Sequence, residues 1–98
     1  MNELETICKA KGYKQIGLNA DWCVPTYLVG VNRFGMQVIV QDLVDADGGY
    51  CVFCYDKEEH DRAVEAEDLE GVDASYHEEE IIHYVDEAVS YAEELLDL

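Results

Sequence analysis

Between Tyr13 and Tyr55 the chain consists of short runs of β-branched and aromatic residues separated by turn residues. Alternate residues of such a run face the same side of a sheet, so the pattern predicts an antiparallel meander. We expect strands at Pro25–Val31, Met36–Leu43 and Tyr50–Tyr55, and a less regular strand over residues 14–20. The sheet should therefore have three or four strands.

Turn-forming residues lie between the predicted strands. The connections are expected at Asp21-Trp22-Cys23, Asn32-Arg33-Phe34-Gly35 and Asp45-Ala46-Asp47-Gly48-Gly49. One face of each of two strands should be apolar, made of Tyr27, Val29 and Val31 in the first and Met36, Val38 and Val40 in the second. Because the residues between them are smaller or polar, we expect one face of the sheet to pack on helices and the other to be partly exposed.

Two helices are predicted in the sequence segments before and after these strands. The first covers residues 2–11, with Asn2 as its N-cap, lysines in its last turn and Gly12 as its stop. The second is a short acidic helix over Glu58–Leu69 that ends near Gly71. Its apolar stripe is thin and consists of Ala63, Val64 and Leu69.

The last segment shows the clearest helical spacing. Ser75 and Glu78 have the spacing of a capping box, which predicts a helix over residues 76–97. Its apolar stripe, at intervals of three and four, is Ile82, Val85, Val89, Ala92 and Leu96. The expected fold is a single α+β domain over residues 1–98, with an N-terminal helix, a three- to four-stranded antiparallel meander and an acidic C-terminal helix packed on one face of the sheet.

Charge is distributed unevenly along the chain. The formal net charge is −17, from 23 acidic and six basic residues. Residues 1–55 carry a net charge of −2, whereas residues 56–98 carry −15. Such a surface repels phosphates, so we expect no direct nucleic-acid binding and no binding to anionic membranes. A basic protein partner would relieve the repulsion between these carboxylates, whereas solubility alone is the simpler explanation.

The sequence also bounds where the protein acts. No segment reaches the roughly 18 apolar residues that a membrane span needs, and the N-terminus lacks the features of a secretory signal. We therefore expect a cytoplasmic protein, and free thiols at Cys8, Cys23, Cys51 and Cys54. Hydrophobic residues make up 49% of the chain, which predicts a folded protein, and the lack of a membrane span predicts a soluble one.

Cys51-Val52-Phe53-Cys54 has a C-x-x-C spacing, which suggests a zinc site or dithiol chemistry. The spacing falls inside a predicted strand, where residues three apart face opposite sides, so the two thiols should not converge. Two buried structural cysteines are the favoured interpretation, and a metal or thiol module centred on Cys51 and Cys54 stays as an alternative.

Other candidate sites are weaker. Asp45-x-Asp47-Gly48 resembles part of a calcium loop, but its glycine is misplaced for an EF-hand, and turn chemistry explains it better. Glu79, His83 and Glu87 are spaced four apart, so they could gather a metal on one flank of the predicted last helix, together with His77 and Glu80. A solvated histidine among carboxylates is the favoured interpretation. Neither Ser75 nor Ser90 lies in a nucleophile elbow, and no glycine-rich phosphate loop is present. We expect no enzyme activity, no catalytic residue, no metal and no cofactor.

The carboxylates remain as the candidate partner-binding site. If the last helix spans roughly 30 Å, its acids have about one charge per 4 Å, similar to the phosphate spacing of a nucleic-acid strand. The preceding acidic segment would add a second row. The predicted partner-binding residues are Glu58, Glu59, Asp61, Glu65, Glu67, Asp68, Glu70, Asp73, Glu78, Glu79, Glu80, Asp86, Glu87, Glu93, Glu94 and Asp97.

This layout, with clusters such as Glu78-Glu79-Glu80 and Glu93-Glu94, resembles phage-encoded anti-CRISPR proteins and other DNA-mimicking inhibitors. The resemblance covers the whole chain in composition and order of elements. It implies a stoichiometric inhibitor that occupies the DNA- or guide-binding channel of a CRISPR effector in the cytoplasm of a host cell. Tyr50, Tyr55, Tyr84 and Tyr91 are candidate anchors for such a basic partner.

Two further hypotheses stay open at this point. The chain is also compatible with an acidic immunity protein or antitoxin that neutralises a basic toxin. In a self-associating structural domain, the stripe of the last helix would instead pair with its own copy. Because acidic helices repel one another, we expect a monomer or a weak homodimer.

Overall fold

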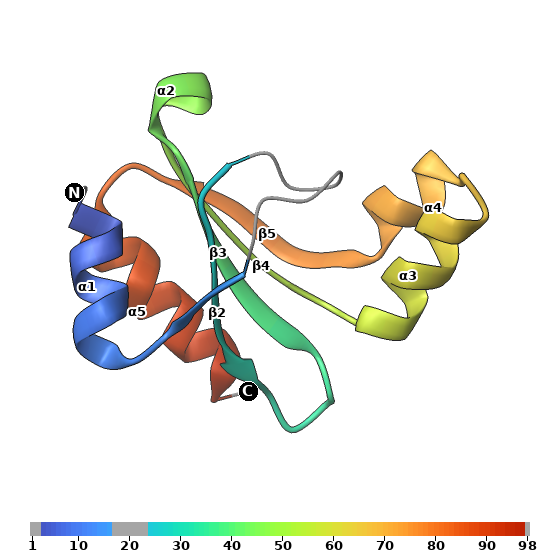
Figure 1. Cartoon of the computed structure of the whole chain (residues 1–98), viewed down its shortest axis with the longest axis horizontal. Helices are drawn as coiled ribbons and strands as arrows, with labels where there is room; N and C mark the ends of the chain where they lie inside the picture. Colours follow the sequence, from blue (N-terminus) through green and yellow to red (C-terminus); the bar gives the residue numbers. More distant parts are fainter. Residues whose placement is uncertain (1–2, 17–23, 98) are drawn as a thin grey trace.

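The computed structural model describes residues 3–16 and 24–97, which form a five-stranded antiparallel sheet with helices around it (Figure 1). Neighbouring strands in the sheet are consecutive in the chain, in the order β1-β2-β3-β4-β5. The elements are α1 (Glu3–Lys11), β1 (Lys14–Ile16), β2 (Thr26–Val31), β3 (Gln37–Leu43), α2 (Val44–Asp47), β4 (Gly49–Tyr55), α3 (Lys57–Glu65), α4 (Leu69–Ala74), β5 (Tyr76–Ile82) and α5 (Val85–Leu96).

The predicted meander is confirmed, because β2, β3 and β4 begin and end within one residue of their expected bounds. The less regular strand is present as β1, while residues 17–20 and the expected Asp21-Trp22-Cys23 loop lie outside the described residues. Every residue of β4 is buried, since this strand has a neighbour on each edge and side chains packed on both faces.

The two predicted turns have different structures. The Asn32–Gly35 segment is a tight turn in which the Asn32 side chain accepts hydrogen bonds from the amides of Phe34 and Met36. Gly35 has a φ of 79°, where a residue with a Cβ would be strained. In the predicted Asp45–Gly49 turn, residues 45–47 instead belong to the one-turn helix α2, Gly48 caps this helix in the left-handed conformation, and Gly49 begins β4.

The main core lies between one face of the sheet and the helices α1 and α5. As predicted, Met36, Val38 and Val40 contribute to this face. From the facing helices, the core receives Leu4, Cys8, Val85, Ala88, Val89, Ala92 and Leu95. Tyr27 and Val29 belong to it too, but Val31 is 56% exposed, because a bulge between Leu28 and Gly30 changes the register of β2. The predicted first helix is confirmed as α1, whereas Asn2 lies outside the described residues.

The prediction of one helix over residues 76–97 is wrong in its first third. Tyr76–Ile82 forms β5, which pairs antiparallel with β4, and the helix α5 starts only at Val85. Ser75 ends α4 and donates a hydrogen bond to the carbonyl of Val72, so it forms no capping box with Glu78. Pairing with β4 satisfies the backbone groups of that buried strand, and this outweighs the helix propensity of three glutamates.

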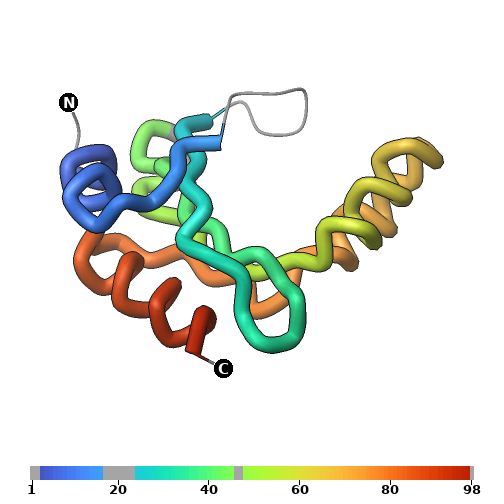
Figure 2. Tube along the Cα trace, turned by 60° about the horizontal axis from the view of Figure 1, so that its bottom comes forward, coloured from blue at the N-terminus to red at the C-terminus, as the bar shows by residue number. Residues whose placement is uncertain are grey.

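The acidic segment before β5 forms two helices instead of one. Asp56 caps α3 by accepting hydrogen bonds from the amides of Glu58 and Glu59, and Asp68 caps α4 by accepting one from Gly71. Between the helices Glu67 has a φ of 56°, which breaks the helical path. Figures 1 and 2 show α3 and α4 side by side as a hairpin that extends from one end of the sheet, opposite the end that carries α1 and α5. We call this unit, residues 56–75, the α3–α4 hairpin.

Candidate acidic binding surface

The predicted partner-binding carboxylates lie on three elements rather than on one helix. Those numbered 58 to 73 lie on the α3–α4 hairpin, those numbered 78 to 80 on β5, and the remainder on α5 or at its C-cap, Asp97. The predicted 30 Å row on a single helix is therefore wrong, because the 12 residues of α5 span only about 18 Å. Together the three elements follow the longest axis of the molecule, 36 Å, from α5 along β5 to the hairpin (Figure 1).

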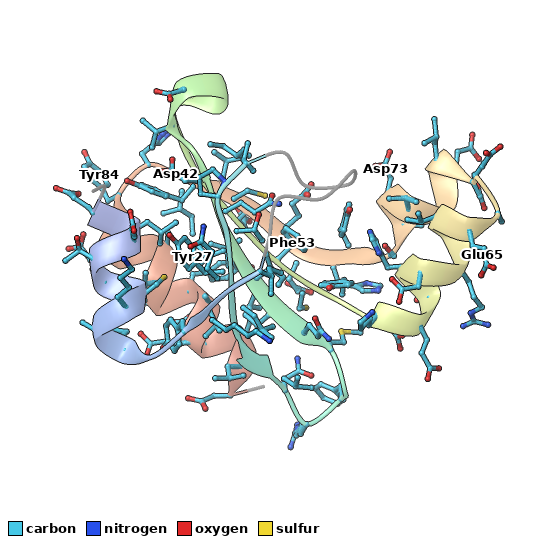
Figure 3. The ribbon with its side chains drawn as sticks, in the orientation of Figure 1. Tyr27, Asp42, Phe53, Glu65, Asp73 and Tyr84 are labelled. Atoms are coloured by element: carbon cyan, nitrogen blue, oxygen red, sulfur yellow. The ribbon has the colours of Figure 1, made fainter. Side chains whose placement is uncertain are left out.

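Almost all of these carboxylates are exposed, and Glu93 is half-buried. Figure 3 shows Glu65 and Asp73 on the hairpin at one end of the molecule, and Tyr84, just before α5, at the other. The acids of α5 face away from the sheet, because the opposite side of this helix is packed on it. The sequence thus predicted correctly that these residues are at the surface, although not which elements carry them.

Asp61, Glu93 and Asp68 already have partners within the chain. The Lys57 ammonium lies 2.7 Å from Asp61 and holds the pKa of that carboxyl below its usual value. Glu93 forms an ion pair of 3.1 Å with Lys11, which ties α5 to the end of α1. Asp68 is the cap of α4. These three carboxylates serve the fold, so they are less suited than their neighbours to bind a partner.

Three carboxylates of α5 line a hollow of about 370 Å³ on the exposed side of this helix. Its lining consists of Asp86, Glu87, Ser90, Tyr91 and Glu94. Burial raises the pKa of the Tyr91 phenol, and the carboxylates of Glu78, Glu80 and Glu94 raise it further. The lining comes from α5 alone, and Glu78 and Glu80 of β5 add negative charge near its Tyr91 phenol. We call this site the α5–β5 hollow.

A bulge in β5 fixes which of its glutamates belong to this hollow. His77 pairs with Cys54 and Glu80 with Val52, so Glu78 and Glu79 both stand opposite Phe53. Glu78 has a φ of 56°, and the Tyr91 hydroxyl donates a 3.0 Å hydrogen bond to its carbonyl. On the opposite face, Glu79 accepts a long hydrogen bond from the Cys51 thiol. Bulges and charges of this kind also protect an edge strand from pairing with another chain.

The α3–α4 hairpin joins the body through a small aromatic cluster. His60 is 3% exposed, and its Nε2 lies 3.2 Å from the Tyr76 hydroxyl. The imidazole also packs on the ring of Tyr55, with 5.2 Å between the ring centroids. The hydroxyl of Tyr55 donates to Gln37 on β3. Sequence reasoning missed this role of His60, because a histidine among acids gives no signal of burial.

The predicted cysteine arrangement is confirmed. Cys51 packs on one face of the sheet and Cys54 on the other, so the C-x-x-C thiols do not converge. Burial raises the pKa of Cys54, and Glu78 raises it further, which keeps this thiol protonated and unreactive. Cys8 is buried as well, with a pKa raised to about 11. Cys23 lies outside the described residues.

The other sequence candidates are not brought together. Glu79 lies on β5, His83 in the turn that follows and Glu87 on α5, so the helical spacing that linked them does not exist. Within residues 3–16 and 24–97, no three His, Cys, Asp or Glu side chains are grouped so that they could hold a metal ion. The self-association hypothesis also loses its surface, because Val85, Val89 and Ala92 are buried against the sheet.

The proposed tyrosine anchors differ in their exposure. Tyr50 and Tyr55 are buried, at 8% and 4% exposed, so they are not available to a partner. Tyr84 is 67% exposed, and Tyr91 is half-buried with its hydroxyl bound to β5. Of the predicted anchors, Tyr84 and the ring of Tyr91 are therefore accessible.

A search with protein-family models, with curated proteins and with solved structures finds no match to this chain. Among the helices that the structure describes, none has the length and apolar character needed to cross a membrane.

Proposed function

We propose that this protein is a stoichiometric inhibitor that binds a Lys/Arg-lined groove of a nucleic-acid-binding protein, such as a CRISPR effector, in place of the nucleic acid. The observation that carries the proposal is the α5–β5 hollow. Three carboxylates of α5 line it, Asp86, Glu87 and Glu94, and none of its lining residues is basic. Glu78 and Glu80 of β5 lie close enough to add to the negative potential at the Tyr91 phenol. A cationic side chain of a partner would relieve their mutual repulsion.

The helix and the strand beside the hollow are also held in place, which distinguishes this site from a surface that serves only solubility. Helix α5 is fixed by its buried side, and the Tyr91 hydroxyl binds the bulge of β5. Groups that are already positioned lose little conformational entropy when a partner binds. A solubilising surface needs no such arrangement, because dispersed charges serve it equally well.

The test uses charge removal at two residues of this region. Glu80→Gln with Glu94→Gln removes two charges beside the hollow, and Glu94 lies near the C-terminus of α5, where a negative charge does not stabilise a helix. The matched control is Glu3→Gln with Asp45→Asn, which removes two exposed charges outside the acidic half. Glu79 and Glu93 are left unchanged, since one lies on the other face and the other pairs with Lys11.

The measurement is displacement of a labelled DNA duplex from a panel of CRISPR effectors and other nucleic-acid-binding proteins, followed by fluorescence anisotropy. The wild type should displace DNA at a ratio near one to one from its target, and the Glu80/Glu94 variant should need at least tenfold more protein. The control variant should match the wild type. Equal losses in both variants, or no displacement across the panel, would show that the proposal is wrong.

Salt concentration provides a second test, because it should change the affinity of the complex and the stability of the free protein in opposite directions. Higher ionic strength should weaken the complex, because it screens attraction between carboxylates and the basic groove. The same salt should raise the melting temperature of the free protein, because it screens repulsion within a chain of net charge −17. A complex that tightens as salt rises would contradict charge-based binding.

A further inference from the structure

The α3–α4 hairpin contains an apolar groove that the fold itself does not fill. The groove has a volume of about 480 Å³, and its apolar lining is Ala63, Val64, Leu69, Val72 and Tyr76. Leu69 is 80% exposed, more than any other large apolar residue that the structure describes. No residue of α4 is buried, so its apolar side chains are not part of the core.

The rim of this groove is acidic. Glu67 and Asp68 line it, and Glu65, Glu70 and Asp73 are exposed on the same hairpin. An apolar centre with a rim of carboxylates is complementary to a segment that has an apolar side chain flanked by Lys or Arg. Amphipathic helices present such anchors at intervals of three and four residues, and grooves bind them by this spacing.

We propose that this groove binds the apolar side of a basic amphipathic helix on the partner protein. The inference rests on the proposed function, in that the partner is basic, but it assigns specificity to a second site at the other end of the molecule from the α5–β5 hollow. The carboxylates at the α5–β5 hollow attract the basic partner by charge. The groove then selects among basic partners, because it requires a correctly spaced apolar anchor.

Charge favours a basic helix in the groove over a second copy of this chain and over an anionic membrane surface. A second copy of the chain would bring its own net charge of −17, and two acidic rims would repel each other. An anionic membrane surface would be repelled by the same carboxylates. A basic helix is the occupant for which both the apolar lining and the charged rim are favourable.

The probe is an 18-residue helical peptide with leucines at intervals of three and four residues and lysines elsewhere. A matched peptide carries serine in place of each leucine. Titration calorimetry measures affinity, and NMR methyl shifts of Leu69, Val64 and Val72 locate the peptide. The leucine peptide should bind at least tenfold more tightly than the serine peptide, since one buried leucine side chain accounts for a factor of this size.

The variant Leu69→Ser should lower affinity for the leucine peptide about tenfold and leave affinity for the serine peptide unchanged. Because Leu69 is exposed, this change should not affect folding. The control is Phe34→Ser, which removes another exposed apolar side chain, at 61%, on the turn between β2 and β3. If Leu69→Ser and Phe34→Ser have the same effect, or if no shifts occur at Leu69, the groove does not bind this helix.

The two proposals can fail separately. If Glu80→Gln with Glu94→Gln impairs DNA displacement while Leu69→Ser has no effect on any partner or peptide, the proposed function stands and the groove inference is overturned. If the leucine peptide binds at Leu69 and no DNA is displaced, the groove inference is supported while the proposed function is wrong.

Discussion

Helix α5 and the α3–α4 hairpin are both rich in carboxylates, but they are attached to the protein in different ways. Helix α5 buries one whole side, with Ala88 and Ala92 fully inaccessible and Val85, Val89 and Leu95 nearly so. In the hairpin, His60 is the one buried residue of α3, and α4 has none. Nine-residue and six-residue helices are marginal on their own, so the hairpin depends on its caps and on the His60 contact.

The difference shows that acidic content does not determine how a segment is held. Apolar residues at helical spacing over twelve positions attach α5 to the sheet, whereas α3 and α4 are too short to present a comparable stripe. We infer that the α5–β5 hollow is a rigid site and that the hairpin opens locally at a lower free energy than the rest of the fold.

The largest predicted effect is a difference in unfolding free energy between two leucine-to-alanine variants, one in α5 and one in the hairpin. Leu95→Ala should lower the free energy of unfolding by about 2–5 kcal/mol, because Leu95 is 3% exposed in the core. Leu69→Ala should change it by less than about 0.5 kcal/mol, because that side chain is exposed. Urea denaturation of both variants measures the difference. Similar losses would mean that the hairpin is as tightly packed as α5.

The second prediction concerns alkaline pH at the junction of the two regions. Burial, together with smaller contributions from Asp61 and Tyr76, raises the pKa of Tyr55 from 10.0 to about 12. Between these pH values the folded state holds a proton that the unfolded state has lost. The stabilisation is therefore complete below pH 10 and is lost as the pH rises through 12, a change of ~2–3 kcal/mol.

Comparison with Tyr55→Phe isolates this contribution, because Tyr13, Tyr27, Tyr50, Tyr91 and Cys8 also have raised pKa values. The variant keeps the ring contacts but loses the hydrogen bond to Gln37, at a cost that does not depend on pH below 10. Its unfolding free energy should fall less steeply between pH 10 and 12 than that of the wild type. Parallel curves would contradict the assignment to Tyr55.

A third prediction separates the stability of the two regions directly. His60→Ala removes a buried ring and its contact with the Tyr76 hydroxyl, which should destabilise the hairpin by about 1–3 kcal/mol. Amide hydrogen exchange should become faster over residues 57–74, and exchange in α5 should change little. Uniformly faster exchange would show that the hairpin and body open as one unit.

The smallest predicted effect tests the caps. Asp68→Ala removes the acceptor for the Gly71 amide and should cost about 1 kcal/mol within the hairpin. Asp73→Ala removes the same charge from an exposed position that does not cap the helix, so it is the matched control. Exchange of the Gly71 amide should rise only in the Asp68 variant. An equal rise in both would indicate a general charge effect.

Local pattern predicted the central sheet well and failed at its last strand. Alternation at Met36, Val38 and Val40 is a property of the residues themselves, and it gave both the strand and its buried face. In contrast, the spacing from Ile82 to Val85 continues a helical pattern across the boundary between β5 and α5. The local sequence does not mark where β5 ends and α5 begins, because the residues of β5 become a strand only through their pairing with β4.

The candidate site shows the same division. Sequence indicated the carboxylates and their exposure, but the convergence of Glu78, Glu80 and Glu94 around Tyr91 requires the β5 bulge and the packing of α5. The groove at Leu69 was visible only as a thin apolar stripe. It became a groove because the helix breaks at Glu67 and folds back.

By itself the sequence determined the fold class, the strands from Thr26 to Tyr55, the opposite facing of Cys51 and Cys54, and the concentration of charge after residue 55. These features follow from side-chain periodicity and composition, which act over a few residues. Tertiary structure alone decided that Tyr76–Ile82 would be a strand and that the acids would lie at two separate sites. The reason is that the open edge of β4 needs backbone partners, and only residues distant in sequence could supply them.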